Sequence, residues 1–210
     1  MTDHIDGALA LSWMNTFTED FHAAQQALTD LDRQAGDGDF GTNIASALRK
    51  VVAELPTADD ATFASVFTAT ANGFLATGGT SGPLFGMWFR AVSRSTATEG
   101  TDTDLLAQGV AAGLAKVQTL GGASVGDNTM IDALAPASQA LLDASTGGLT
   151  VDKALTSAAR AARAGAASTA DLLAARGRAS YVGDLALGVE DPGAVTVAIF
   201  FEAGAAALSA

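Results

Sequence analysis

The chain has 210 residues, which is long enough for one domain with a sizeable hydrophobic core. Its formal charge of −12 argues against nucleic acid or an anionic membrane as a partner, because both require a basic footprint. The absence of cysteine excludes a disulfide framework and a thiolate metal site, and we find neither a signal-peptide pattern nor a run of about 20 apolar residues. We therefore expect a cytoplasmic protein with a single domain over residues 1–210.

The spacing of apolar residues predicts an all-α protein with eight helices. Alanine, the best helix former, is abundant, and aromatic residues make up only 6% of the chain, so the helices are expected to pack closely. Leu9, Trp13 and Phe17 show the helical period in the first of them. The expected helices span about residues 5–31, 41–55, 60–76, 102–120 and 150–175, and three more begin near residues 83, 128 and 192.

Two prolines and one segment with the composition of a β-strand bear on where the predicted helices begin and how they run. Residues 195–201 would suit a buried strand by local propensity, but no second strand-like segment is present to pair with them, so a helix is expected. Pro83 suits the first position of the fourth helix, where its missing N–H has no intrahelical partner. Pro136 is expected to kink the sixth helix. Residues 176–181 and 188–191 are expected to be loops.

The most distinctive segment lies between the first two helices and is strongly acidic. It holds Asp32, Asp37 and Asp39, and like charges crowded on a tight loop repel one another. A hard cation such as Mg²⁺ or Ca²⁺ removes that repulsion, and a pair of Mg²⁺ ions bridging a nucleotide would use all three carboxylates. An EF-hand is excluded, because Asn43 stands at the twelfth position, where that motif needs a glutamate. A Gly- and Asp-rich turn between two helices is an equal alternative.

A glycine-rich segment at residues 78–83 directly precedes a helix. Backbone N–H groups and the helix dipole favour an anion such as phosphate at that place. The segment is not a P-loop, because no Gly-Lys dipeptide occurs in the chain. A helix cap with a flexible turn is the structural alternative.

Three further positions are candidates for a binding site, each with a structural alternative. Arg178 suits bidentate contact with phosphate. Asp191, directly before Pro192, could equally be a helix N-cap. Met130 suits either the core or a base contact, and Asp127 is a candidate N-cap of the sixth helix. Neither of the two histidines has the partners of a catalytic triad, so a histidine-based catalyst is not expected.

Taken together, the motifs resemble the signature of one family. Residues 36–43 read GDGDFGTN, residues 78–86 read GGTSGPLFG and residues 126–136 read GDNTMIDALAP. Further on, residues 177–183 read GRASYVG and residues 191–194 read DPGA. In this order and spacing they resemble the nucleotide-binding L subunit of dihydroxyacetone kinase (DhaL, the DAK2 domain family), over essentially the whole chain.

The resemblance implies an eight-helix, up-and-down antiparallel barrel that holds ADP or ATP and two Mg²⁺ ions at one end. It implies that the metal ions are bound by Asp32, Asp37 and Asp39. It also implies a set of nucleotide contacts, namely Phe40, Gly41, Thr42, Asn43, Thr80, Ser81, Gly121, Met130, Arg178, Asp191, Pro192 and Gly193.

The resemblance further implies that this chain is half of an enzyme. Dihydroxyacetone, or a related short ketose, would be held by a separate K subunit (DhaK-like), so no catalytic residue is expected here. The phosphoryl source would be either exchangeable ATP or retained ADP that a phosphotransferase-system protein (DhaM-like) recharges. Assembly as a homodimer or a hetero-oligomer is expected.

Two departures from the family pattern lie close to the expected phosphates. Phe40 stands where the family usually has histidine, and Asn128 stands where it usually has lysine, while Thr80 for alanine is a minor change. Losing one charge-assisted contact typically costs about 1.5–3 kcal/mol, which weakens transfer without abolishing binding. These departures make a non-catalytic ADP-binding regulatory module an alternative. A fatty-acid-kinase-like nucleotide domain and a purely structural helical protein are further alternatives.

Overall fold

The computed structural model describes residues 5–95, 102–176 and 187–208, and they form an all-helical protein. Eight α-helices and a short 3-10 turn, η1, occur in these ranges, and no strand does, which confirms the predicted fold class. The elements are α1 (Gly7–Ala35), α2 (Phe40–Glu54), α3 (Phe63–Leu75), α4 (Ser81–Ser95), α5 (Asp102–Gly121), α6 (Ile131–Thr146), α7 (Val151–Ser168), η1 (Thr169–Asp171) and α8 (Pro192–Ala207).

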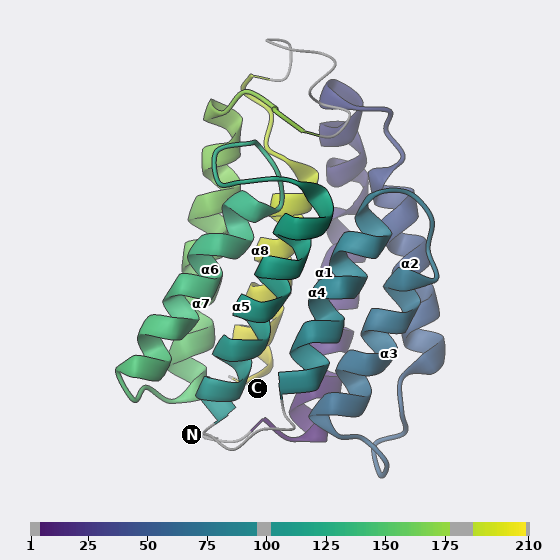
Figure 1. Cartoon of the computed structure of the whole chain (residues 1–210). Helices are drawn as coiled ribbons and strands as arrows, with labels where there is room; N and C mark the ends of the chain where they lie inside the picture. Colours follow the sequence, from purple (N-terminus) through teal and green to yellow (C-terminus); the bar gives the residue numbers. More distant parts are fainter. Residues whose placement is uncertain (1–4, 96–101, 177–186, 209–210) are drawn as a thin grey trace.

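The helices run up and down in turn, so that the connections lie at two ends of the molecule (Figure 1). Each helix packs against the next one in the sequence, and α8 packs against α1, so the succession of neighbours is closed. The connections at residues 36–39, 76–80 and 122–130 and the segment that leads into α8 share one end. The connections at residues 55–62 and 147–150 lie at the other end.

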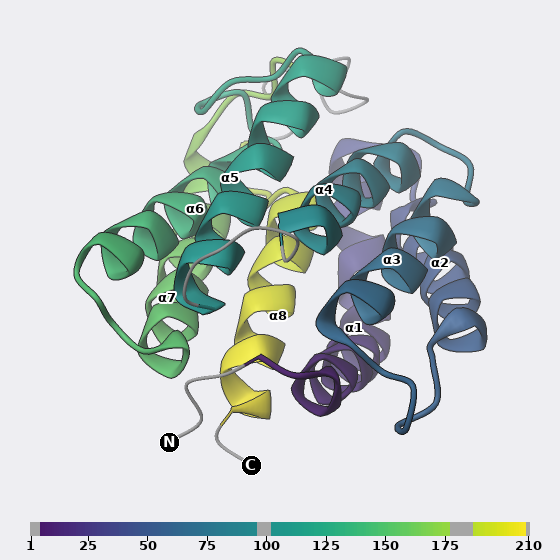
Figure 2. The same ribbon diagram turned by 60° about the horizontal axis from the view of Figure 1, so that its bottom comes forward.

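The core is an aromatic cluster centred on α8, which stands among the other helices in Figure 2. Phe200 of α8 contacts the rings of Trp13, Phe67 and Trp88, with centroid distances of 4.7, 6.2 and 4.9 Å. The Trp13 indole N–H donates to the Phe200 carbonyl at 2.7 Å, so a buried polar group is satisfied where α1 meets α8. Burial on all sides explains why residues 195–201 carry the apolar, β-branched composition of a strand within a helix.

Local capping explains where several helices begin. The Asp6 carboxylate accepts the Leu9 N–H at 2.8 Å at the start of α1. Thr62 and Ser65 form a capping box at the start of α3. α4 begins at Ser81 rather than at Pro83, so the proline is the third helical residue, where its missing N–H still breaks no bond.

The prediction that the seventh helix continues to residue 175 is wrong. α7 ends at Ser168, and η1 follows it. Thr169 is fully buried; its hydroxyl donates to the Ala166 carbonyl at 2.6 Å and accepts the Asp191 N–H at 2.8 Å. This contact joins the end of α7 to the start of α8. α6 runs through Pro136 as one helix, and the kink expected there stays a prediction.

Candidate functional site

A cavity lies at the end of the molecule where the acidic and glycine-rich connections meet, and it is lined by residues from every motif of the sequence that the structure describes. Its lining combines carboxylates, small polar residues and apolar side chains. The lining residues are Asp32, Ala35, Asp39, Phe40, Thr80, Ser81, Leu84, Phe85, Val117, Gly121, Ala123, Asn128, Thr129, Met130, Ile131, Arg176, Val189, Glu190, Asp191, Pro192 and Gly193.

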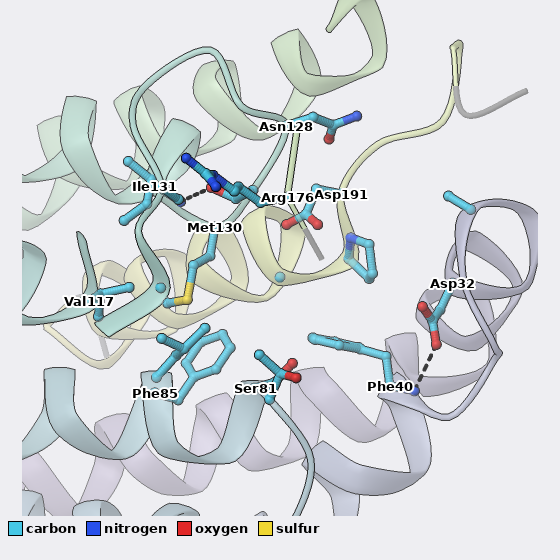
Figure 3. A pocket seen from close by; sticks show the side chains of 18 of the residues that line it. Asp32, Phe40, Ser81, Phe85, Val117, Asn128, Met130, Ile131, Arg176 and Asp191 are labelled. Carbon is cyan, nitrogen blue, oxygen red and sulfur yellow. Dashed lines mark hydrogen bonds between the residues drawn. The ribbon is translucent and has the colours of Figure 1, made fainter. Parts of the chain in front are cut away.

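The two sides of the cavity differ in chemistry (Figure 3). Asp32 and Phe40 lie on one side, at the junction of α1 and α2. Val117, Met130 and Ile131 lie on the other side and present apolar atoms. An elongated ligand with a charged end and a flat apolar end matches this division.

The three predicted metal ligands lie close together. Asp32, Asp37 and Asp39 each offer a carboxylate oxygen within 4.8 Å of the others. Asp32 is in the last turn of α1, and its Oδ2 accepts the backbone N–H of Phe40 at 2.9 Å, which fixes the carboxylate against the start of α2. A side chain at position 36 would overlap the Asp32 carboxylate, so this position of the carboxylate requires a glycine at residue 36. An all-oxygen set of this kind fits Mg²⁺ or Ca²⁺.

The start of α8 places another carboxylate in the cavity. Asp191 is the N-cap of α8, and its Oδ2 accepts the Ala194 N–H at 2.7 Å. Desolvation raises the pKa of the Asp191 carboxyl to about 7, and the nearby Asp132 and Asp32 carboxylates add to the rise. The N-cap alternative for Asp191 is therefore confirmed, and the same residue faces the cavity.

A tight loop before α6 forms part of the apolar side of the cavity, and the Asp132 carboxylate holds this loop in place. The Asp132 carboxylate is almost fully buried and accepts the backbone N–H groups of Gly126 and Thr129. Between these two contacts Asn128 takes a left-handed conformation with φ of 57°, which asparagine tolerates better than lysine. The prediction that Asp127 caps the sixth helix is wrong, because its carboxylate accepts the Ser124 N–H instead.

Most of the predicted nucleotide contacts meet at this cavity. The lining includes Phe40, Thr80, Ser81, Gly121, Met130, Asp191, Pro192 and Gly193. Gly41, Thr42 and Asn43 follow Phe40 in the first turn of α2 but do not line the cavity. Arg178 lies outside the described residues.

Comparison with known proteins identifies the family. Residues 34–206 match the sequence profile of the DAK2 domain. The chain belongs to the DAK2 domain family. An ADP-binding subunit DhaL of a PEP-dependent dihydroxyacetone kinase from Listeria innocua is 35% identical over 195 residues, which cover 92% of this chain and 93% of the relative. The corresponding subunit of Escherichia coli is 36% identical over 189 residues, which cover 89% and 90% of the two chains.

A solved kinase structure shares the fold. The dihydroxyacetone kinase of C. freundii in complex with AMP-PNP and Mg²⁺ superposes with a TM-score of 0.73 at 30% identity. The match covers 97% of this DAK2 chain and 34% of the C. freundii chain, so this protein spans about a third of that kinase. No helix in the described ranges of the DAK2 chain is long and apolar enough to cross a membrane.

Sequence reasoning missed two charged residues of the DAK2 site. Asp132 shapes the loop before α6, and its buried position was not evident from an aspartate in the first turn of a helix. Arg176 lines the cavity, but in the sequence it stands at the start of an expected loop with no periodic signal around it. Its proximity to Asp127, at 3.6 Å from Nε to Oδ2, depends on two segments that only folding brings together.

Proposed function

We propose that this chain is the nucleotide-binding subunit of a dihydroxyacetone-type kinase, which presents the terminal phosphate of a magnesium nucleotide to a small ketose on a partner subunit. The observation that carries the proposal is that a three-aspartate cluster, two of whose members line the cavity, lies at the same cavity as the start of α8. The names of the L. innocua and E. coli relatives and the AMP-PNP and Mg²⁺ of the C. freundii complex support it.

In this proposal Asp32, Asp37 and Asp39 hold Mg²⁺, with two ions expected. Bound Mg²⁺ would neutralise charge on the phosphates and hold them in line for transfer. The nucleotide contacts are the residues predicted from the family: Phe40, Gly41, Thr42, Asn43, Thr80, Ser81, Gly121, Met130, Arg178, Asp191, Pro192 and Gly193. The backbone N–H groups at the start of α4, beside Thr80 and Ser81, suit a phosphate oxygen.

The change from histidine to phenylalanine at position 40 is compatible with this arrangement. Asp32 uses the backbone N–H of Phe40, which any side chain leaves in place. Asn128 likewise has a structural role, since its side-chain amide donates to the Leu172 carbonyl at 3.1 Å. Both residues therefore keep the geometry of the cavity, while Phe40 lacks the imidazole and Asn128 lacks the positive charge of the residues usual in the family.

Phosphoryl transfer requires partners in this proposal. The L. innocua and E. coli relatives are named as subunits of a kinase, which supports a ketose acceptor held on a separate K subunit. The PEP-dependent relatives favour retained ADP that a phosphotransferase-system protein recharges over freely exchanging ATP. The chain would act in the cytoplasm, either as a homodimer or within a hetero-oligomer.

Thermal unfolding with nucleotide and metal tests the proposal. A ligand at a hundred times its dissociation constant adds about 2.7 kcal/mol to the free energy of unfolding. For a chain of this size ADP with Mg²⁺ should raise the Tm by roughly 5–10 °C. Asp37→Asn should abolish the Mg²⁺-dependent part of the rise, whereas Asp59→Asn, an exposed change at the opposite end, should leave it intact.

Two results would count against the proposal. Equal Tm values with and without nucleotide at saturating Mg²⁺ would leave only the fold in common with the family. A nucleotide-dependent shift without any product in a coupled assay with a K subunit would instead favour a regulatory ADP-binding module.

A further inference from the structure

The cavity has a marked imbalance of charge on its described walls. Asp32, Asp39, Glu190 and Asp191 contribute carboxylates. Arg176 contributes the one positive charge among the described lining residues. Whether Arg176 contacts the phosphates or the base of a bound nucleotide depends on where its side chain lies in the cavity.

Arg176 is held in place by contacts between two chain segments. The Ala175 N–H donates to the Asp127 carbonyl at 3.1 Å, and the Asn128 side chain donates to the Leu172 carbonyl at 3.1 Å. These bonds join residues 172–176 to the loop before α6. The Arg176 Nε then lies 3.6 Å from the Asp127 carboxylate, which itself accepts the Ser124 N–H at 2.8 Å.

The side chain lies on the apolar side of the cavity. Figure 3 shows Arg176 on the same side as Met130 and Ile131, across the cavity from Asp32 and Phe40. Met130 and Ile131 are buried, while the Arg176 side chain keeps 55% of its surface exposed. The Asp127 carboxylate lies beside the Nε of Arg176 and holds the guanidinium on this side of the cavity, where its planar face is available to a flat part of a ligand.

We infer that Arg176 is a base-binding residue, with its guanidinium plane against the face of the nucleotide base and Asp127 positioning it. This inference rests on the proposed function, because it assumes that a nucleotide occupies the cavity with its phosphates at the aspartate cluster. A planar guanidinium stacks on an aromatic ring, and Met130 and Ile131 supply apolar surface for the same ring. The contact is independent of how many phosphates the ligand carries.

Titration of a ligand series tests the inference. Calorimetry would compare adenosine, AMP and ADP, each with Mg²⁺, on the unaltered chain, on Arg176→Ala and on Arg176→Lys. Arg176→Ala should raise all three dissociation constants by a similar factor, about threefold to thirtyfold. Arg176→Lys should weaken binding almost as much as Arg176→Ala does, because lysine retains the positive charge but lacks the planar guanidinium. Arg160→Ala, an exposed arginine of α7 outside the cavity lining, is the control for net charge.

The role of Asp127 has its own test. Asp127→Asn can still accept the Ser124 N–H but loses the ion pair with Arg176. It should weaken ADP binding on the unaltered background and have no further effect when combined with Arg176→Ala, because the two residues act through one contact.

The results separate this inference from the proposed function. Failure of the unaltered chain to bind any ligand in the series would overturn both. Normal binding by the unaltered chain with equal binding by Arg176→Ala would overturn only the role of Arg176. A loss that grows from adenosine to ADP and is recovered in Arg176→Lys would show a phosphate contact in place of base stacking.

Discussion

Asp191 has a carboxyl whose environment opposes ionisation. Its pKa is raised to about 7 by desolvation and by the Asp132 and Asp32 carboxylates, against an ordinary value of 3.8. The folded state therefore binds a proton more tightly than the unfolded chain. The stabilising contribution of the protonated Asp191 carboxyl is therefore fully present below about pH 4 and is lost as the pH rises through about 7.

This residue predicts a specific pH dependence. In the absence of Mg²⁺ and nucleotide, Asp191→Asn should be more stable to unfolding than the unaltered chain. The difference in the free energy of unfolding should grow from pH 4 to pH 7 and reach up to a few kcal/mol. Asparagine keeps an N-cap acceptor for the Ala194 N–H, so the helix start is preserved. Urea unfolding at several pH values measures the difference. Parallel pH profiles for the two proteins would contradict it.

Single residues differ in how far the sequence predicts their roles. Asp191 precedes Pro192 at a helix start, so its capping role follows from a local rule. The three aspartates at the end of α1 and in the turn to α2 are close in sequence, and their proximity in space follows from the tight turn that Gly36 and Gly38 permit. Arg176 and Asp127 are 49 positions apart, so no local rule could have paired them.

At the scale of elements, helix existence is predictable and helix ends are not. The apolar period that predicts α1 to α7 arises because one face of each helix is buried, whereas α8 is buried on all sides and has no such period. The end of α7 depends on the Thr169 hydroxyl, which meets the Asp191 N–H only once α8 is packed beside it. That contact has no counterpart in the local sequence.

The contact between α6 and α7 leads to a prediction for Gly165. Pro136 lacks an N–H, so the Asp132 carbonyl loses its usual donor within α6, and Gly165 of α7 packs directly against this carbonyl. A Cβ added at Gly165 would overlap the Asp132 carbonyl oxygen and come within 2.9 Å of Pro136 Cγ. Because backbone atoms cannot rotate away, α6 and α7 would have to separate.

Gly165→Ala should therefore lower the free energy of unfolding by about 1–3 kcal/mol, although alanine is the better helix former. Ala164→Gly, at the exposed neighbouring position, is the matched change for helix propensity alone and should lower it by about 1 kcal/mol. Chemical unfolding of both variants provides the comparison. A Gly165→Ala protein as stable as the unaltered chain would show that the two helices have room for the methyl group.

At the scale of the whole molecule, the cavity arises from the up-and-down order of the helices. This order brings the ends of α1, α3, α5 and α7 and the starts of their successors to one end of the molecule (Figure 1). Motifs that are 40 or more residues apart in sequence thus line one space. The separate motifs were predictable, but the division of the cavity into an acidic and an apolar side depends on packing.

The same geometry predicts that nucleotide acts on one end of the protein. With ADP and Mg²⁺ bound, backbone amides in the connections that surround the cavity should exchange hydrogen more slowly, because ligand contacts oppose their local opening. These connections, with the first residues of the helices that follow them, span residues 36–40, 77–82, 122–130 and 187–193. Amides at residues 55–62 and 147–150 open locally at the far end and should exchange at unchanged rates.

Hydrogen exchange followed by mass spectrometry, with Mg²⁺ alone as the reference, measures both ends in one experiment. Slowing confined to the cavity end would place the ligand among the converging connections, as the charge and shape of the lining require. Equal slowing at both ends would point to a global change in stability, and slowing only at residues 55–62 and 147–150 would place the ligand at the wrong end for the three aspartates.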